Sequence, residues 1–250
     1  MSPNPKEPMK TLKTLKKPVS LRSHVEDYLR EAIMEGRFKP GERLRERELC
    51  EMLQVSRPSV REALRRLEAE KLVTTVLHQG PTVTEMKEDE ATDIYAIRAL
   101  MEGYAVHQFT LLASDGAINE LKKAVQNLHK AAKKRDQKLL IQAKARFYDV
   151  ILDGCGNALV REILVNLLSR ISLLRAKSFS GPDRLPKSLK EIDTLFGHIE
   201  ARNAEAAQAS AHQHIRNAEK TALDVMTQQA QKQNVDEDVS PALSSGPCKA

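Results

Sequence analysis

The stretch SRPSVREALRRLEAEKLV, residues 56–73, decides the fold because it has the pattern of a short helix with two different faces. Ser56 is a suitable N-cap, and Pro58 lies in the first turn, where a helix loses no hydrogen bond to it. The apolar residues follow the i, i+3, i+4, i+7 spacing of a buried face: Val60, Ala63, Leu64 and Leu67. The residues left on the opposite face are Arg57, Ser59, Arg61 and Arg65.

The flanking segments predict a winged helix-turn-helix domain over residues 19–86. An apolar stripe predicts a helix over 21–35, GRFKPGERL then turns the chain, and a second short helix covers 46–53. QVS leads into the helix that begins near Ser56. LVTTVLHQGPTVTEM, residues 72–86, alternates β-branched residues around a Gly-Pro turn, as a β-hairpin does.

In such a domain the N-terminal half of the second helix of the motif enters the major groove of DNA. Arginines there can bond both O6 and N7 of a guanine or grip phosphates, and the formal net charge of +6 suits an anionic partner. The alternative is a solvated face whose arginines pair with nearby glutamates, but the preceding turn and the following hairpin favour DNA binding. A nonspecific architectural DNA binder is a further alternative, against which the large helical remainder argues.

That remainder, residues 87–230, shows almost no strand pattern and predicts an all-helical domain. The whole chain is therefore expected to be mainly α, with a winged helix-turn-helix followed by a bundle of six or seven helices. Residues 1–18 are expected to form a flexible basic arm that either touches DNA or is only solvated, and residues 231–250 are polar enough to be expected as a disordered tail. The helices are expected near 88–113, 115–134, 136–153, 157–179, 184–202 and 204–230.

Composition excludes several classes of protein. Hydrophobic residues make up 41% of the 250, enough for a packed core, yet no run of 18 apolar residues would span a membrane. The three cysteines lie far apart without a CxxC pair, so no disulfide framework or cysteine zinc site is expected. The N-terminus lacks the apolar stretch of a signal peptide, so we expect a cytoplasmic protein with no membrane partner. No HExxH, GxSxG or Walker A motif occurs, so no enzyme is expected.

The segment KPGERLRERELCEMLQVSRPSVREALRRLEAEKLV, residues 39–73, resembles the DNA-binding domain of GntR-family bacterial transcription regulators. The helical remainder resembles the FCD ligand-sensing domain of the FadR-type subfamily. Three segments carry this second resemblance: DIYAIRALMEGYAV (93–106), GCGN (154–157) and RNAEAAQASAHQHI (202–215). The resemblance implies a homodimer on a palindromic operator, most often a repressor, whose affinity for DNA responds to a small-molecule effector.

The resemblance also implies which residues contact DNA. The family's contacts fall on Arg47 in the second helix and on Ser56, Arg57 and Arg61 at the recognition helix. Gln79 and Gly80 match the tip of the wing, which reaches a minor groove. Arg45 replaces a small or polar residue, and it either adds a phosphate contact or is only solvated.

The FCD resemblance implies a metal held by one Asp and three His, and this sequence departs from that set. Lys144 replaces the Asp, Tyr148 the first His and Ile192 the second, so only His214 remains. One imidazole cannot supply the three or four ligands of a divalent cation, and no metal or other cofactor is expected. His214 is then either a pocket residue or a hydrogen-bonded core histidine.

An ammonium stands where the metal's charge would be, which suggests a metal-free site for a small carboxylate. Lys144 and Tyr148 share a face, and Arg98 points inward with Ile94 and Met101, so all three can meet a carboxylate. The competing partner of Arg98 is Glu102, one turn on. Further candidate ligand residues are Arg170 and Arg175, for which a surface position is the alternative. Two alternatives to a small carboxylate remain: the helical domain binds a larger acyl ligand, or it only dimerises.

Overall fold

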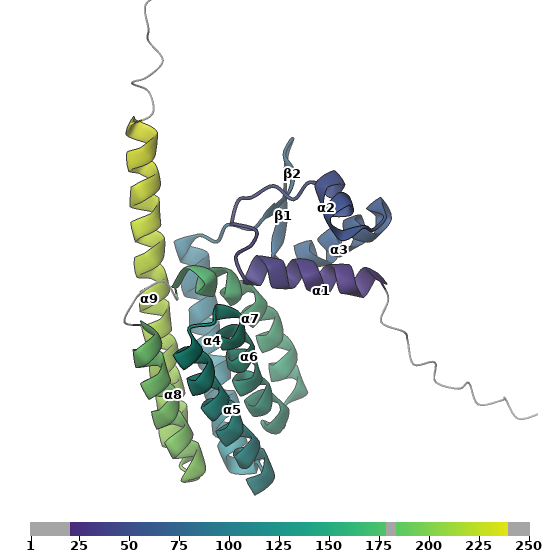
Figure 1. Ribbon diagram of the computed structural model, residues 1–250. Coiled ribbons are helices and arrows are strands. Elements are labelled where there is room, and N and C mark those ends of the chain that lie inside the picture. Colours follow the sequence, from purple (N-terminus) through teal and green to yellow (C-terminus); the bar gives the residue numbers. More distant parts are fainter. Residues whose placement is uncertain (1–20, 179–183, 240–250) are drawn as a thin grey trace, which may run out of the picture.

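The structure is a computed structural model that describes the backbone of residues 21–178 and 184–239. The expected basic arm at 1–18 lies outside these residues. The first part of the chain folds in the predicted order, α1 (Leu21–Met34), α2 (Glu46–Leu53), α3 (Arg57–Ala69), β1 (Val73–Val76) and β2 (Gly80–Val83). It is a winged helix-turn-helix (Figure 1).

One apolar core holds this winged domain together. The periodic face of α3 packs against α1 and α2, and β1 and β2 pair antiparallel with Val73 opposite Val83. The segment before α2 runs beside β2, where the Leu44 amide donates to the Pro81 carbonyl at 2.8 Å. The buried members of the core are Val25, Leu29, Ile33, Leu44, Leu49, Val60, Ala63, Leu64, Leu67, Leu72, Val73 and Val83.

Six helices follow in the described residues, as the sequence predicts. They are α4 (Glu88–Leu112), α5 (Asp115–Lys134), α6 (Gln137–Gly154), α7 (Ala158–Ser178), α8 (Arg184–Glu200) and α9 (Ala204–Val239). The side chain of Ser114 caps α5 and that of Asp136 caps α6. Buried apolar residues from all six of these helices meet in one core, among them Phe109, Leu121, Ile151, Leu164, Ile199 and Ala207.

Helix α9 runs along the bundle and past its end (Figure 1). It continues to Val239, so the prediction that disorder begins at residue 231 is wrong for 231–239. The segment QKQNVDEDV holds no Pro or Gly, and the first proline beyond it is Pro241, which explains why the helix can persist. Residues 240–250 lie outside the described part.

The winged domain lies at one end of the bundle (Figure 1). Its helix α1 lies across that end and packs against α7. Lys138 Nζ lies 3.3 Å from Glu35 Oε1 across this junction. Among the described residues, no helix has both the length and the apolar character needed to cross a bilayer.

Candidate functional site

The recognition helix α3 exposes three arginines on one side and buries its apolar side. Arg57, Arg61 and Arg65 are all exposed, as the pattern predicts. Ser59 is not, because only 7% of it is accessible and its Oγ lies 3.0 Å from Ser56 Oγ. The prediction that Ser59 lies on the outer face is therefore wrong. Ser59 precedes the buried Ala63 by one helical turn of four residues, which places both on the same face.

Arg61 is held in place by an acid on the preceding helix. Its Nε and Nη2 donate to the two carboxylate oxygens of Glu46 at 3.1 and 2.9 Å. These hydrogen bonds hold the pKa of the Glu46 carboxyl below its ordinary value, and the nearby charges of Arg57 and Arg65 add to the effect. The sequence pattern does not predict the role of Glu46, because the contact joins two helices across the turn.

The two arginines at the start of α2, Arg45 at its N-cap and Arg47, form weaker ion pairs. Arg45 Nη1 lies 2.8 Å from Glu48 Oε1, and Arg47 Nε lies 3.7 Å from Glu51 Oε1. All four side chains are more than half exposed, and exposed ion pairs contribute little stability. Both arginines can therefore exchange these partners for a phosphate at small cost.

Of the predicted tip residues of the wing, Gln79 lies in the turn between β1 and β2, and Gly80 is the first residue of β2. Gln79 is exposed, and its amide donates to the Val76 carbonyl at 3.1 Å. His78 and Gly80 both have positive φ, 64° and 81°, which a tight hairpin turn requires. No atom lies within 4 Å of the position of a Cβ on Gly80, so this edge of the wing is open.

In the helical domain, Arg98 is the centre of a buried polar cluster. It is 1% exposed, and it donates through Nε to Glu102 and through Nη2 to the Tyr148 hydroxyl at 2.9 Å. Burial alone would lower the pKa of the Arg98 guanidinium, but the Glu102 carboxylate together with Tyr148 and Tyr95 outweighs it and raises the pKa above its ordinary value. The structure thus joins Arg98 directly to Tyr148, and it also gives Arg98 the competing partner Glu102.

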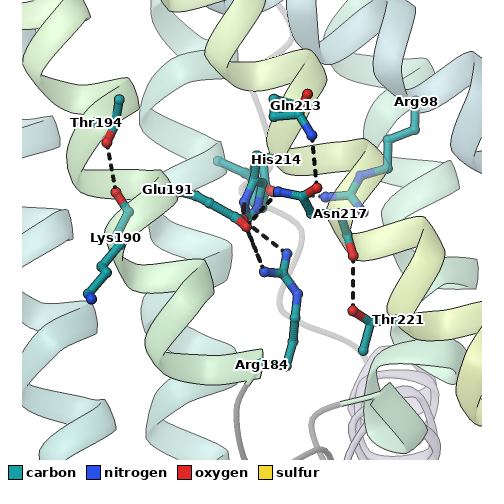
Figure 2. A network of polar contacts seen from close by, with 10 residues as sticks. Arg98, Arg184, Lys190, Glu191, Thr194, Gln213, His214, Asn217 and Thr221 are labelled. Atoms are coloured by element: carbon teal, nitrogen blue, oxygen red, sulfur yellow. Dashed lines mark hydrogen bonds and ion pairs between the residues drawn. The ribbon is translucent and has the colours of Figure 1, made fainter.

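A second buried cluster centres on Glu191 of α8, a residue that the sequence pattern does not mark as part of a site (Figure 2). Its Oε2 lies 2.6 Å from His214 Nδ1, and its Oε1 accepts from Asn217 at 2.8 Å. Arg184 donates to both oxygens at 2.9 to 3.0 Å. Burial raises the pKa of the Glu191 carboxyl, but these hydrogen bonds outweigh it and lower the pKa to about 2.

His214 is neutral in this setting. Burial is the main cause that lowers its pKa to about 4, and the positive charges of Lys144 and Arg98 lower it further. Because the Glu191 carboxylate can only accept, the ring proton must lie on Nδ1, which leaves Nε2 as an acceptor. Nε2 is buried and has no hydrogen-bond partner among the described residues.

The space between these clusters is small. Lys144 and Tyr148 are buried on the inner face of α6, at 7% and 6% exposure. A cavity of about 10 Å³ is lined by side chains that include Glu102, Tyr148 and His214. That is room for about one water molecule. A larger molecule therefore needs these side chains to move.

The residues present do not fit the metal that the FCD resemblance implies. The four positions of the family's ligand set hold an ammonium at Lys144, a phenol at Tyr148, the buried aliphatic chain of Ile192 and the imidazole of His214. Among the described residues, no group of three His, Cys, Asp or Glu side chains could hold a metal ion. A divalent cation needs at least three such ligands from the protein.

Arg170 does not join the buried clusters. It lies on α7, where Nη2 contacts Glu90 at the start of α4 and the side chain faces the winged domain. Its assignment to the same pocket as Arg98 is therefore wrong. The long α7 carries the arginine beyond that pocket, toward the end of the bundle. The side chain of Arg175 lies outside the described residues.

Comparison with known proteins identifies a known family for each of the two domains. The profile of the gntR family of bacterial regulatory proteins matches residues 21–83, and that of the FCD domain matches residues 93–217. Over 202 residues, the chain is 27% identical to the uncharacterised HTH-type transcriptional regulator YdhC of Bacillus subtilis (strain 168). This covers 80% of the chain and 90% of that protein.

Two further proteins are similar. The chain is 29% identical over 196 residues to the HTH-type transcriptional repressor GlaR of Escherichia coli (strain K12), covering 75% of the chain and 89% of the repressor. The structure of E. coli McbR/YncC matches with a TM-score of 0.72 over 85% of this chain and all of that one. At 24% identity the structural match shows the fold alone. The chain thus belongs to the gntR family of bacterial regulatory proteins and, with its FCD domain, is a DNA-binding transcription regulator rather than an enzyme.

Proposed function

We propose that this regulator is a homodimeric repressor that binds a palindromic operator and is released by a small organic acid. The observation that carries the proposal is the exposed arginine face of α3, set between a tight turn and a wing. A dimer places two such helices in successive major grooves. The similarity to a protein named as a repressor supports this direction of control.

We assign the DNA contacts by position on the domain. Arg57 and Arg61, in the first turns of α3, read base edges, and Arg65 lies further along the same exposed face and meets phosphate. Ser56 and the N-terminus of α3 also favour a phosphate. Arg45 and Arg47 extend the phosphate contacts along α2, and the wing tip at 79–80 reaches a minor groove. Ser59 has no contact of its own and only supports Ser56.

The outer face of α4 supports the dimer. Ile97, Leu100, Tyr104 and Leu111 are exposed at spacings of three, four and seven residues, so they form a stripe along one side of the helix. The opposite side of α4 is buried in the bundle. A helix that is apolar on both sides is typical of a buried position, and a second copy of the same stripe would bury this one.

The polar groups of the buried clusters support an anionic effector. Among the described residues they include the cations Arg98, Lys144 and Arg184, while His214 is neutral. A cation held away from water is stabilised by an anion that hydrogen-bonds to it. A monocarboxylate would supply such an anion without a metal, and a hydroxyl on the same molecule could donate to His214 Nε2. The small cavity favours a short acid over a long acyl chain.

The same small cavity also favours a second candidate function, a helical domain that dimerises and senses nothing. In that case the polar clusters only stabilise the fold, and operator affinity does not respond to acids. The two candidates differ in the response of the protein to ligands, whereas both require sequence-specific DNA binding.

The DNA-binding half of the proposal is tested with an operator selected from random duplexes. We expect Arg57→Ala to weaken binding to that operator by about tenfold or more, since a bidentate base contact contributes about 1–3 kcal/mol. Arg146→Ala, at an exposed arginine of α6 on the other domain, is the control and should bind like the wild type. If selection enriches no sequence, the protein is a nonspecific binder and the proposal fails.

The effector half is tested by thermal shift on metal-stripped protein with short monocarboxylic acids, 2-hydroxy acids among them. We expect at least one acid to raise the melting temperature without added metal, and Lys144→Met to abolish the rise. Lys130→Met removes an exposed lysine and should leave the response unchanged. A response that requires zinc would contradict the metal-free site, and no response to any acid would favour the dimerisation domain.

A further inference from the structure

A groove of about 600 Å³ lies between the winged domain and α7, separate from the buried clusters described above. One wall is formed by α1 and by the end of α3 with the turn that follows it, and the other by one side of α7. Domain interfaces commonly hold small-molecule sites, and such sites have volumes of roughly 300–1,000 Å³. The groove is thus large enough for a ligand, whereas the cavity in the bundle has room for about one water molecule.

The acidic residues of this groove already have cationic partners. Arg30 donates to Glu70 at 2.7 and 3.0 Å and to Glu26 at 2.6 Å. Arg66 Nη1 adds a contact to Glu26 at 3.1 Å. Both carboxylates are therefore neutralised by arginines of the winged domain itself. They do not give the groove a surplus of negative charge.

Two cationic groups face the groove with donor capacity left over. Arg170 of α7 uses Nη2 for Glu90, but its Nε is buried and has no hydrogen-bond partner among the described residues. Lys71, in the turn after α3, is exposed, and its ammonium forms no ion pair within the described part of the chain. The two groups come from different domains, and a buried donor without a partner is unfavourable.

The wall between them is partly apolar. Ile163 and Leu167 line the groove from α7, and Ala69 lines it from the end of α3. Ile163 is 37% exposed, so a ligand could still bury part of it. A ligand that suits this groove therefore has an anionic head for the two cations and an apolar body for these side chains.

We propose that this groove is a second ligand site, which binds a small aliphatic carboxylate with its head between Lys71 and Arg170. Because the ligand would contact both domains at once, it would stabilise their present relative orientation. That orientation sets where each recognition helix lies in a dimer, so occupancy of the groove would change operator affinity. The site is independent of the proposed acid site in the bundle.

The test is calorimetric titration of the full-length protein with hexanoate, with acetate and hexanamide as matched probes. We expect hexanoate to bind, acetate to bind more weakly because it lacks the apolar body, and hexanamide not to bind because it lacks the charge. Lys71→Gln and Arg170→Gln should each raise the hexanoate dissociation constant by about tenfold, the effect of losing a charged hydrogen bond.

Two variants distinguish binding in the groove from binding in the bundle and from the loss of an ion pair. Because Arg170→Gln also removes the ion pair with Glu90, Glu90→Gln is its control. Glu90→Gln removes the charge of that pair while keeping the guanidinium, and it should bind hexanoate at least as tightly as the wild type. Lys144→Met alters the bundle site and should leave hexanoate binding unchanged. The proposal is overturned if the wild type does not bind hexanoate, if Lys71→Gln binds it normally, or if binding is lost in Lys144→Met.

Discussion

The imidazole of His214 is held neutral by its surroundings, and this makes the stability of the protein depend on pH. Its pKa of about 4 in the folded chain is below the ordinary 6.5, so the unfolded chain takes up a proton first as the pH falls. The stability that His214 contributes is complete above pH 6.5 and is lost between about 6.5 and 4. We expect the free energy of unfolding to fall by roughly 2–3 kcal/mol over this window.

The check is urea unfolding at several pH values, with His214→Gln as the variant. The variant should lack most of the decline between pH 6.5 and 4, while His24→Gln, at an exposed histidine of α1, should keep it. Glu191 acts in a lower window, because its folded pKa of about 2 lies below 4.5 and its contribution is lost between those values. An equal decline in His214→Gln and the wild type would refute the assignment to His214.

Single residues also show which contacts a sequence pattern can predict and which it cannot. The pairing of Arg98 with Glu102 follows from i,i+4 spacing, and the burial of Ser59 could have been read from its spacing to Ala63. The partners Glu46 and Glu191 could not, because each meets its cation or imidazole across two helices. Periodicity gives the face of a helix on which a residue lies, but not which residue of another helix faces it.

At the scale of elements, α4 and α9 approach so closely that only a glycine fits between them at position 103. A Cβ on Gly103 would lie 2.0 Å from His212 Nε2 and 2.4 Å from its Cδ2. Overpacking a core typically costs about 1–3 kcal/mol, which exceeds the gain of up to about 1 kcal/mol in helix propensity from Gly to Ala. Gly103→Ala should therefore lower the free energy of unfolding measured in urea.

The matched control is Gly197→Ala in α8, where no atom lies within 4 Å of the added Cβ. That variant should gain roughly 0.5–1 kcal/mol from helix propensity alone. Adding His212→Ala to Gly103→Ala should recover much of the loss, because it removes the clashing ring. If Gly103→Ala were as stable as Gly197→Ala, the two helices would have room to separate and the close contact would not limit this position.

The whole molecule depends on contacts that local patterns do not contain. The sequence predicts the two domains and the order of their helices, because each helix has its own apolar stripe and is bounded by residues that end helices. The position of the winged domain against the bundle involves instead contacts such as that of Glu35 with Lys138 of α6, and Arg170 is held near this end of the bundle by Glu90 of α4. The partners in each pair are at least 80 positions apart, and no periodicity relates them. The misplacement of Arg170 follows directly from this.

At the scale of the whole molecule, a substitution in the α4 stripe tests the proposed dimer. Leu100 is 65% exposed, the most of the four residues of the stripe, and a charge there would have to be buried on association. Leu100→Glu should raise the dimer dissociation constant by about a hundredfold, as truncation of a central interface residue can. Sedimentation equilibrium measures this, and Leu139→Glu, at an exposed leucine of α6, should leave the dimer intact. Operator affinity should fall with dimer stability, because a monomer carries a single recognition helix and contacts one half-site. If Leu100→Glu remained dimeric and bound the operator normally, the two copies would have to meet through another face.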